Sequence, residues 1–417
     1  MKIAYIVPKL AQRGPVIVVR ELVAQMTAHG HECTVFYFDE GPDELGFPCA
    51  TRRIRWRSGA AAGEKPADEG RGAACGGPGG LDFNRFDIVH SHGLRPDAYV
   101  CLHKPARSHA RCITTLHNYV FDDLRYEYNR LTAFIAGRAW LAALRRHDTV
   151  VTLSQDALRY YSRYLPAGKL TYAYNTRRLP AAGDDGADGS NGFSPLSAAE
   201  ITEATAFPQA RPQAAPIPAA GNATPETARP QLQAEPATHN ATPRPAQPQA
   251  YLIGVHAELT HRKGIDQLLR VLPQLPDYRL LIIGDGPSRA ELEQLAADNG
   301  VADRVRFLGR RPNAWRYLPL YDLYALPSRS EGFPLALLEA AAHGSAVVCS
   351  DLPLFKELIT ENEVAFFESE NPDSLREAIL NATARKAGLA QNLHARYRAA
   401  FSPGHFYERY LEIYESR

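Results

Sequence analysis

The sequence lacks the features that mark nucleic-acid-binding, secreted and membrane-spanning proteins. Its 47 basic and 46 acidic side chains leave a formal net charge of +1, which argues against bulk nucleic-acid binding. No apolar run approaches the roughly 20 residues that a membrane span requires, and the short apolar start at residues 3–7 is not a signal peptide. The six cysteines show no C-x-x-C or Cys/His spacing, so we expect reduced thiols and no zinc site. We therefore expect a cytoplasmic protein.

The chain of 417 residues is long enough for two or three domains. It opens with an apolar run at residues 2–7, a turn containing Gly14, a helical pattern at 16–28 and a second apolar run at 33–38. This order predicts the β-α-β unit of a parallel sheet. Strands expected near 251–256, 280–283 and 305–308, with helices at 265–275 and 288–299, predict a second unit of the same kind.

Two stretches break the alternation of strands and helices. Residues 58–80 are rich in Gly and Ala, and residues 180–249 are dominated by Ala, Pro, Gln, Thr and Gly with few aromatics. Such compositions do not bury enough apolar surface to fold. We predict a flexible insertion at 58–80 within a first domain (1–179), a disordered linker at 180–249, a second domain (250–400), and a C-terminal helix (401–417) that packs back on the first domain.

The stretch from 321 to 349 has the order strand, loop, helix, strand. Residues 335–343 are strong helix formers, Pro334 suits the first turn of that helix, and Gly344 is where it would end. Free amides and the positive end of the helix dipole would point at the occupant of the loop. This arrangement predicts a site for an anion, most simply a phosphate.

Two carboxylates flank this predicted helix start. On one helix, Glu331 and Glu339 would lie about 12 Å apart along the axis. Paired glycosidase carboxylates lie about 5 to 9.5 Å apart, so the spacing argues against a hydrolytic pair and favours two groups that hold parts of one elongated ligand. By spacing alone, a surface Glu in a loop and a solvated Glu on a helix are an equal alternative.

The stretch SEGFPLALLEAAAHGSAVV resembles the E-x7-E signature of retaining glycosyltransferases of family 4. The resemblance implies the GT-B fold, an α/β fold of two Rossmann-like doubly wound domains that face each other across a cleft. It implies that Glu331 contacts the donor sugar, that Glu339 holds the nucleotide ribose, and that intervening amides hold the diphosphate. The donor-binding residues it implies in this stretch are Gly332, Phe333, Pro334 and Leu335, followed by Glu339.

Other motifs resemble the same family at matching places. His117 in TTLHNY resembles the donor-side histidine, and Lys263 in RKG, beside Arg262, resembles the diphosphate-binding lysine. Gly14 stands in the first loop, where relatives usually carry two glycines, and Glu258 stands where the lysine motif normally has an arginine. The resemblance assigns catalysis to Glu331, His117 and Lys263. It assigns donor binding also to Arg262, Gly284 and Gly14, and the acceptor side to His92.

The residues around these assignments argue against a resident cofactor. Gly284 and Gly286 form only a G-x-G pattern, with Arg289 where a third Gly would stand, so NAD binding is poorly supported. Histidines at the strand ends have no carboxylate or Cys partner at metal-ligand spacing. We expect a nucleotide sugar as substrate, no cofactor and no metal.

Residues 124–146 form a long amphipathic pattern with five arginines on its polar side. Such a helix either packs its apolar face on the sheet or lies on an anionic lipid surface. Relatives that act on lipid-linked acceptors use this region at the membrane, so we expect a peripheral contact at the inner face of the cytoplasmic membrane.

Three functions remain open at this point. The first is sugar transfer from a UDP- or GDP-sugar to a glycan or lipid-linked acceptor, with retention, in cell-surface polysaccharide biosynthesis. The second is a GT-B nucleotide-sugar epimerase, which needs no acceptor. The third is a catalytically impaired sugar-nucleotide-binding protein, which Glu258 and the single glycine of the first loop favour.

Overall fold

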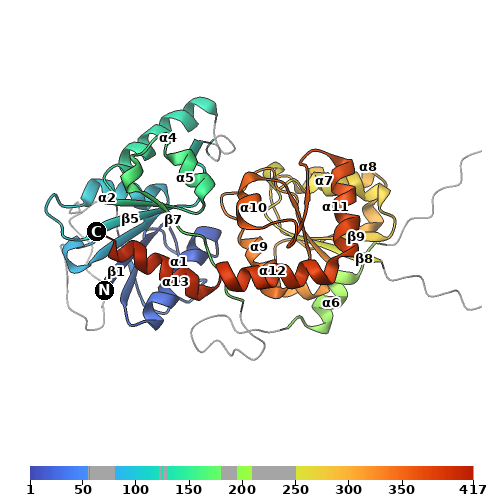
Figure 1. The fold of residues 1–417 in the computed structure, drawn as a ribbon, viewed down its shortest axis with the longest axis horizontal. Helices are drawn as coiled ribbons and strands as arrows, with labels where there is room; N and C mark the ends of the chain where they lie inside the picture. The colour runs from blue at the N-terminus through green and yellow to red at the C-terminus, as the bar shows by residue number, and fades with distance from the viewer. Residues whose placement is uncertain are drawn as a thin grey trace, which may run out of the picture.

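Two parallel sheets form the two halves of the molecule, as the computed structural model shows (Figure 1). It describes residues 1–54, 56, 80–121, 124, 129–179, 195–208 and 250–416. The insertion predicted at 58–80 lies outside the described residues except for Gly80. Helices cover both faces of each sheet, so the expected fold class of two doubly wound α/β halves is confirmed.

The first sheet has seven parallel strands in the order β3-β2-β1-β4-β5-β6-β7. Strand β1, inside this sheet, buries alternate residues on opposite faces, because successive side chains of a strand point to opposite sides. Ile3 and Tyr5 pack with α1 (Gly14–Ala28) and α13 (Pro403–Glu415), whereas Ala4 and Ile6 pack with α2 (Leu94–His103). The strands are β1 (Lys2–Val7), β2 (Glu32–Tyr37), β3 (Ala50–Arg53), β4 (Ile88–His92), β5 (Arg111–Leu116), β6 (Thr149–Thr152) and β7 (Leu170–Tyr172).

The second sheet has six parallel strands in the order β10-β9-β8-β11-β12-β13. Its central strand β8 pairs with β9 on one side and with β11 on the other. Two clusters of buried apolar residues cover its two faces, with Ile253 and Val255 in one and Leu252 in the other. The strands are β8 (Tyr251–His256), β9 (Tyr278–Ile283), β10 (Val305–Phe307), β11 (Leu323–Leu326), β12 (Val347–Ser350) and β13 (Ala365–Phe367).

The helices follow the strands in the alternation expected of such folds. Those of the first half are α1 (Gly14–Ala28), α2 (Leu94–His103), α4 (Arg130–Leu144) and α5 (Gln155–Tyr161). Those packed on the second sheet are α6 (Ala198–Thr205), α7 (Ile265–Val271), α8 (Arg289–Asp298), α9 (Leu335–His343), α10 (Pro353–Leu358), α11 (Pro372–Ala384) and α12 (Lys386–Ala400).

The C-terminal helices cross between the halves. Helix α12 packs on α9 of the second half, and α13 (Pro403–Glu415) then lies against α1 of the first half (Figure 1). Tyr410 and Tyr414 of α13 are buried in the same apolar cluster as Ile3 and Tyr5. The last helix is therefore part of the core beneath the first sheet.

Residues 195–208 correct the expectation that the whole stretch 180–249 is without structure. Helix α6 forms there, with a capping box between Ser197 and Glu200. Its Ala204 is fully buried on the second half, and Arg279 lies 5.1 Å from the centre of the Phe207 ring. Composition averaged over the stretch hid this short capped segment. Residues 180–194 and 209–249 lie outside the described residues.

The helix expected at 124–146 is shorter than predicted. Helix α4 begins at Arg130, because Asn129 caps it by accepting a hydrogen bond from the Thr132 amide at 2.9 Å. A capping Asn marks a helix start, and the apolar pattern upstream of it concealed this signal. Residues 122–123 and 125–128 lie outside the described residues.

Candidate active site

Three histidines predicted at the strand ends of the first sheet, His90, His92 and His117, form a cluster in which His90 and His92 are buried and His117 is half-buried. His92 Nδ1 lies 3.1 Å from His117 Nε2, and the rings of His90 and His92 lie 4.2 Å apart. Burial lowers the pKa of all three imidazoles, that of His117 to about 4. All three are therefore neutral near pH 7, where each ring has one donor and one acceptor nitrogen.

The three histidines differ in their partners. His90 is bonded on both sides, to Tyr414 OH at 2.7 Å and to Thr115 Oγ1 at 2.8 Å. It links α13 to the first sheet and has no nitrogen left for a ligand. His92 Nε2, by contrast, is buried and has no hydrogen-bond partner within the described ranges. A buried nitrogen without a partner is able to bond a ligand, whereas both nitrogens of His90 are already bonded. The acceptor-side assignment therefore fits His92 better than His90.

The second half meets this cluster through Gly332. A Cβ at that position would lie 2.2 Å from the carbonyl oxygen of His117, so no larger residue fits without displacing the backbone. The loop between Glu331 and α9 therefore touches the loop after β5. The structure brings together two predicted site elements that lie more than 200 residues apart in the sequence.

The first loop of the chain also faces the second half. Gly14, at the start of α1, would place a Cβ 3.7 Å from Leu335 Cδ1 at the start of α9. Gln12 Nε2 donates a hydrogen bond to Asn313 Oδ1 at 3.2 Å. The N-terminal ends of α1 and α9 therefore point toward the same boundary, where backbone amides and two helix dipoles favour negative charge.

Glu331 is buried among groups that stabilise its negative charge. Lys263 Nζ donates to its Oε1 at 2.7 Å, Ser328 Oγ donates at 2.6 Å, and Arg262 lies 3.6 Å from Oε2. Burial by itself would raise the pKa of this carboxyl, but Lys263 and Arg262 outweigh it and hold the pKa below its ordinary value. Glu331 is therefore a carboxylate at neutral pH.

The turn at Gly264 explains how Lys263 reaches Glu331. Gly264 adopts a φ of 64°, and a Cβ there would lie 1.9 Å from the Pro327 carbonyl oxygen. This close packing brings the RKG turn against the loop after β11. The neighbouring cations Arg262 and Lys263 consequently converge on one carboxylate, although adjacent residues in a chain need not do so.

Glu258 takes no part in the ion pairs around Glu331 within the described residues. Its side chain is exposed, and it makes no hydrogen bond or ion pair in the part of the chain that the structure describes. Gly284, at the end of β9, packs instead against Ala257, whose carbonyl oxygen would lie 1.8 Å from an added Cβ. The structure thus places Gly284 beside the loop after β8 rather than in contact with Glu331.

Glu339 is largely shielded from water at the boundary between the halves and is paired with a cation that sequence reasoning missed. Arg177 Nε donates to Glu339 Oε1 at 2.8 Å, and His256 Nε2 lies 3.3 Å from Oε2. Burial would raise the pKa of Glu339, but Arg177 and His256 lower it to about 2. Arg177 follows the strand that closes the first sheet, and a basic residue there is the only signal that the sequence offers.

A second unpredicted contact joins the halves near His117. Glu357 of α10 accepts hydrogen bonds from the backbone amides of Gln155 and Asp156, at 2.7 and 2.8 Å. Tyr174 OH donates to the same carboxylate at 3.1 Å. Asp156 in turn accepts from Tyr119, two residues after His117, at 2.5 Å. A carboxylate of the second half thus caps a helix of the first.

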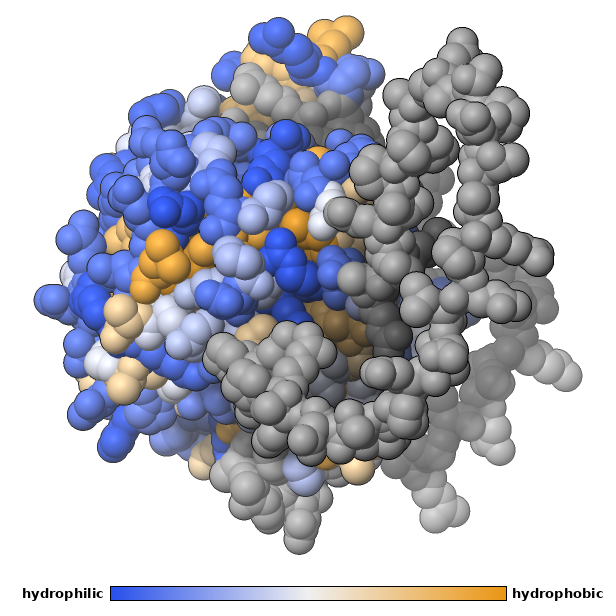
Figure 2. All heavy atoms as spheres, turned by 90° about the vertical axis from the view of Figure 1, so that its right-hand side faces the viewer, coloured by the Kyte–Doolittle hydropathy of each residue, from blue (hydrophilic) through white to orange (hydrophobic). Residues whose placement is uncertain are grey.

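The apolar side of α4 is divided between core and surface. Trp140, Leu141 and Leu144 are buried, whereas Leu131, Phe134 and Ile135 are 70%, 57% and 59% exposed. Figure 2, which keeps the vertical axis of Figure 1, shows hydrophobic and hydrophilic residues side by side at the top, where α4 projects. Within the described ranges, no helix has both the length and the apolar character needed to cross a bilayer.

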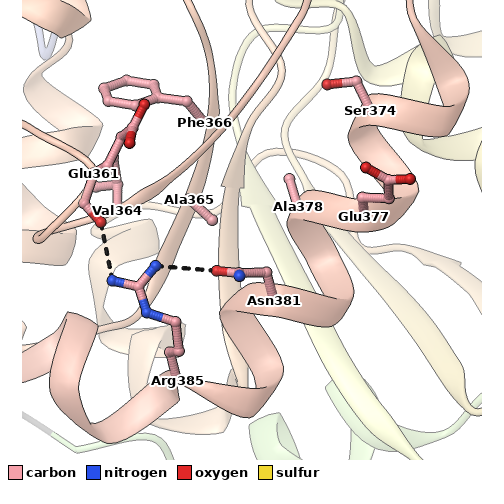
Figure 3. Close-up of a pocket in the computed structure, with 9 residues that line it drawn as sticks. All are labelled: Glu361, Val364, Ala365, Phe366, Ser374, Glu377, Ala378, Asn381 and Arg385. Atoms are coloured by element: carbon pink, nitrogen blue, oxygen red, sulfur yellow. Dashed lines mark hydrogen bonds between the residues drawn. The ribbon is translucent and has the colours of Figure 1, made fainter.

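A pocket of about 290 Å³ lies elsewhere in the second half, between β13 and α11 (Figure 3). Its cation, Arg385, is already bonded to the Glu361 carbonyl and to Asn381 Oδ1. None of the predicted site residues lines it. The pocket is therefore separate from the candidate active site.

Comparison with known families covers both halves. The model described as Glycosyltransferase Family 4 matches residues 13–176, and that described as Glycosyl transferases group 1 matches residues 241–399. The O-antigen biosynthesis glycosyltransferase WclY of Escherichia coli is 28% identical over 417 residues, which cover 100% of this chain and 98% of WclY. The lipopolysaccharide core biosynthesis mannosyltransferase LpsB of Rhizobium meliloti is 37% identical over 117 residues, 26% of this chain and 33% of LpsB.

Solved structures show the same fold. HepE of Anabaena, determined in complex with UDP and glucose, has a TM-score of 0.68 at 15% identity, covering 99% of both chains. WaaG, a glycosyltransferase involved in lipopolysaccharide biosynthesis, has a TM-score of 0.60 at 13% identity, covering 100% of both chains. With a family model matched in each half and a GT-B architecture throughout, the chain belongs to glycosyltransferase family 4.

Proposed function

We propose that the protein transfers a sugar from a UDP- or GDP-sugar to a glycan or lipid-linked acceptor, with retention of the anomeric configuration and without a metal. The observation that carries this proposal is the contact of Gly332 with the His117 carbonyl, which unites the loop of Glu331 with the neutral histidines of the first half. The names of WclY and LpsB place relatives in O-antigen and lipopolysaccharide synthesis. We extend cell-surface polysaccharide biosynthesis to this chain on that basis.

The roles follow from the charges at the site. Sugar transfer leaves negative charge on the departing diphosphate, and Lys263 and Arg262 are the cations that converge beside the loop before α9. The amides at the start of α9 add hydrogen-bond donors to the same region. In the proposal these two cations stabilise the negative charge of the departing diphosphate, so no divalent metal is required.

Glu331 and His117 are proposed to contact the sugar. Glu331 stays ionised through Lys263 and Ser328, so it accepts hydrogen bonds from sugar hydroxyls. His117 is held neutral by burial and therefore has one nitrogen that donates and one that accepts. The contact between His92 Nδ1 and His117 Nε2 fixes the ring of His117, and the free Nε2 of His92 is proposed to face the acceptor.

Binding and turnover of UDP-, GDP- and ADP-sugars test this proposal. We expect one donor to raise the melting temperature of the wild type, and we expect Lys263→Ala and Glu339→Ala to abolish the rise. Slow release of free sugar from that donor would report a chemically competent site. Formation of an epimer without any acceptor would instead support the epimerase reading, and no shift with any of the three would overturn the proposal.

We further propose a peripheral membrane contact, at the inner face of the cytoplasmic membrane, through residues 124–146. Leu131, Phe134 and Ile135 expose apolar side chains on α4, and Arg130 and Arg138 lie on the same helix. Apolar insertion combined with attraction to anionic headgroups is how such helices bind a bilayer. In flotation with phosphatidylglycerol vesicles, the wild type should float with the vesicles, and the variant with Leu131, Phe134 and Ile135 all changed to Ser should not. Equal flotation of the two proteins would refute the contact.

A further inference from the structure

Arg177 lies where the chain crosses between the two halves. It follows β7 on the segment that leaves the first sheet, and its carbonyl accepts a hydrogen bond from Tyr397 OH at 2.8 Å. The preceding residue, Thr176, donates to the Phe401 carbonyl at 2.6 Å. Tyr397 and Phe401 stand at the end of α12, immediately before α13 returns to the first half. The backbone of Arg177 is therefore fixed at this crossing.

The side chain of Arg177 lies between one carboxylate from each half. Its Nε donates to Glu339 Oε1 of α9 at 2.8 Å, and its Nη1 lies 3.7 Å from Glu21 Oε1 of α1. The exposed fractions of the three side chains are 12% for Arg177, 14% for Glu339 and 4% for Glu21. Little water reaches these charges, so their pairing is screened much less than that of a surface ion pair.

The two carboxylates depend on Arg177 to different degrees. Arg20 Nη1 also lies 3.7 Å from Glu21 Oε1, so Glu21 keeps a second cation if Arg177 is removed. Glu339 would keep only His256, at 3.3 Å, among the groups found within ion-pair distance of it in the described residues. Arg177 also heads the groups that lower the pKa of Glu339 against its burial. Loss of Arg177 should therefore affect Glu339 most.

We infer that Arg177 is a positioning residue that orients Glu339 for the two adjacent hydroxyls of a nucleotide ribose, and that it ties this recognition to the crossing between the halves. The inference rests on the proposed function. Arg177 occupies one lone-pair direction of Oε1 and thereby fixes the plane of the carboxylate. His256 faces Oε2 at 3.3 Å, and the other lone-pair directions of the carboxylate are the ones we assign to hydrogen bonds from a vicinal diol. Arg177 acts through Glu339 and does not itself touch the ligand.

The experiment measures recognition of the ribose hydroxyls separately from overall binding. Calorimetric titration of the full chain with UDP, GDP and ADP identifies the base, and titration with the matching 2′-deoxy and 3′-deoxy nucleotides measures the contribution of each hydroxyl. We expect wild type to prefer the ribonucleotide by about tenfold or more, as for a hydrogen bond to a charged acceptor. Arg177→Gln should reduce this preference to less than about threefold.

Two further variants separate orientation from charge and from folding. Arg177→Lys keeps a cation but not the Nε–H that bonds Oε1, so it should retain only part of the ribose preference. Arg178→Gln makes the same change of charge one residue further on, at an exposed position, and should keep the whole preference.

The outcomes distinguish this inference from the proposed function. If Arg177→Gln binds ribo- and deoxynucleotides equally more weakly, with the preference intact, Arg177 has a merely structural role and the inference is overturned. If Arg177→Gln does not fold, an unchanged preference in Arg177→Lys, with no dependence on the lost Nε–H, overturns it as well. If wild type binds none of the three nucleotides, the proposed function fails and takes the inference with it.

Discussion

The two halves prepare their shares of the site by opposite electrostatic means. The first half contributes imidazoles that burial keeps neutral, with His117 the clearest case. The second half contributes carboxylates that stay ionised because each is paired with a cation, Glu331 with Lys263 and Glu339 with Arg177. Neutral groups that both donate and accept hydrogen bonds suit sugar hydroxyls. Of the fixed charges, the cations suit the diphosphate of a nucleotide and the carboxylates suit its ribose hydroxyls.

The difference also shows what each half pays to bury its polar groups. A neutral imidazole needs only a hydrogen-bond partner, and His92 and His117 supply one to each other. A buried carboxylate needs a cation as well, since an isolated charge is far more costly to remove from water. Changes in the second half should therefore be more damaging than comparable changes in the first.

Removal of Lys263 should have the largest effect and test that difference directly. Lys263→Ala leaves Glu331 buried beside Arg262 alone, and should lower the free energy of unfolding by up to about 3 kcal/mol. It should lower kcat about 10²- to 10³-fold, because a cation for the leaving group is lost. Denaturant unfolding and steady-state kinetics measure the two effects.

The double change Lys263→Ala with Glu331→Gln provides the matched control. Without the buried charge, stability should return toward that of the wild type, while turnover should stay low. If the single variant were as stable as wild type, the pairing would not be what keeps this carboxylate buried. The statement that the second half keeps its buried carboxylates ionised by pairing them with cations would then be wrong.

The two halves should lose stability in different pH ranges. The pKa of His117 falls from an ordinary 6.5 to about 4, so the unfolded chain takes up its proton first as the pH decreases. Stability should therefore fall between about pH 6.5 and 4, by up to about 1.4 kcal/mol per pH unit for each such histidine. The pKa of Glu339 falls from 4.5 to about 2, so its contribution is present above pH 4.5 and disappears only below it.

Unfolding curves at pH 7, 5.5 and 4 measure the first range, and His117→Asn should make the fall in stability less steep, because His90 and His92 still contribute to it. Glu339→Gln should leave that range unchanged and alter stability only through the loss of its ion pair. An equal pH dependence in wild type and His117→Asn would show that this imidazole is not held neutral in the folded protein.

Glu357→Gln should have the smallest of these effects, because it weakens the boundary without removing a catalytic group. The Gln retains one acceptor for the amides of Gln155 and Asp156 but loses the negative charge at the start of α5. We expect a loss of about 1 kcal/mol in stability and a more extended molecule in small-angle X-ray scattering. Glu377→Gln, an exposed change on α11, is the control. An unchanged scattering profile for Glu357→Gln would show that this contact does not hold the halves together.

The elements that local sequence predicted best are those whose signals lie within them. The helix expected at 335–343 is α9 at those bounds, since helix formers run unbroken up to Gly344, which adopts a φ of 79°. The apolar runs at 2–7 and 251–256 are likewise β1 and β8. In contrast, β3 escaped prediction because all of its residues are exposed, so it has no apolar pattern, although it pairs in parallel with β2.

The site divides in the same manner between what is local and what is distant. The residues Glu331, Glu339, Lys263 and His117 are recognisable from their own motifs, because those motifs are short and contiguous. Arg177 and Glu357 are not, because their partners Glu339 and Gln155 lie 162 and 202 residues away in the chain. Neither Arg177 nor Glu357 belongs to a sequence motif that predicts a role for it.

The sequence by itself thus determined the two α/β halves, the strand ends that bear polar side chains, and the start of α9, where we propose an anion site. Hydrophobic periodicity and helix-stop residues suffice for these, because they act over a few neighbouring positions. Only the tertiary structure decided which cation holds each carboxylate, where α6 docks and where the halves touch. Those contacts depend on the packing of distant segments, and burial, which a sequence does not display, decides whether each imidazole is neutral and each carboxylate ionised.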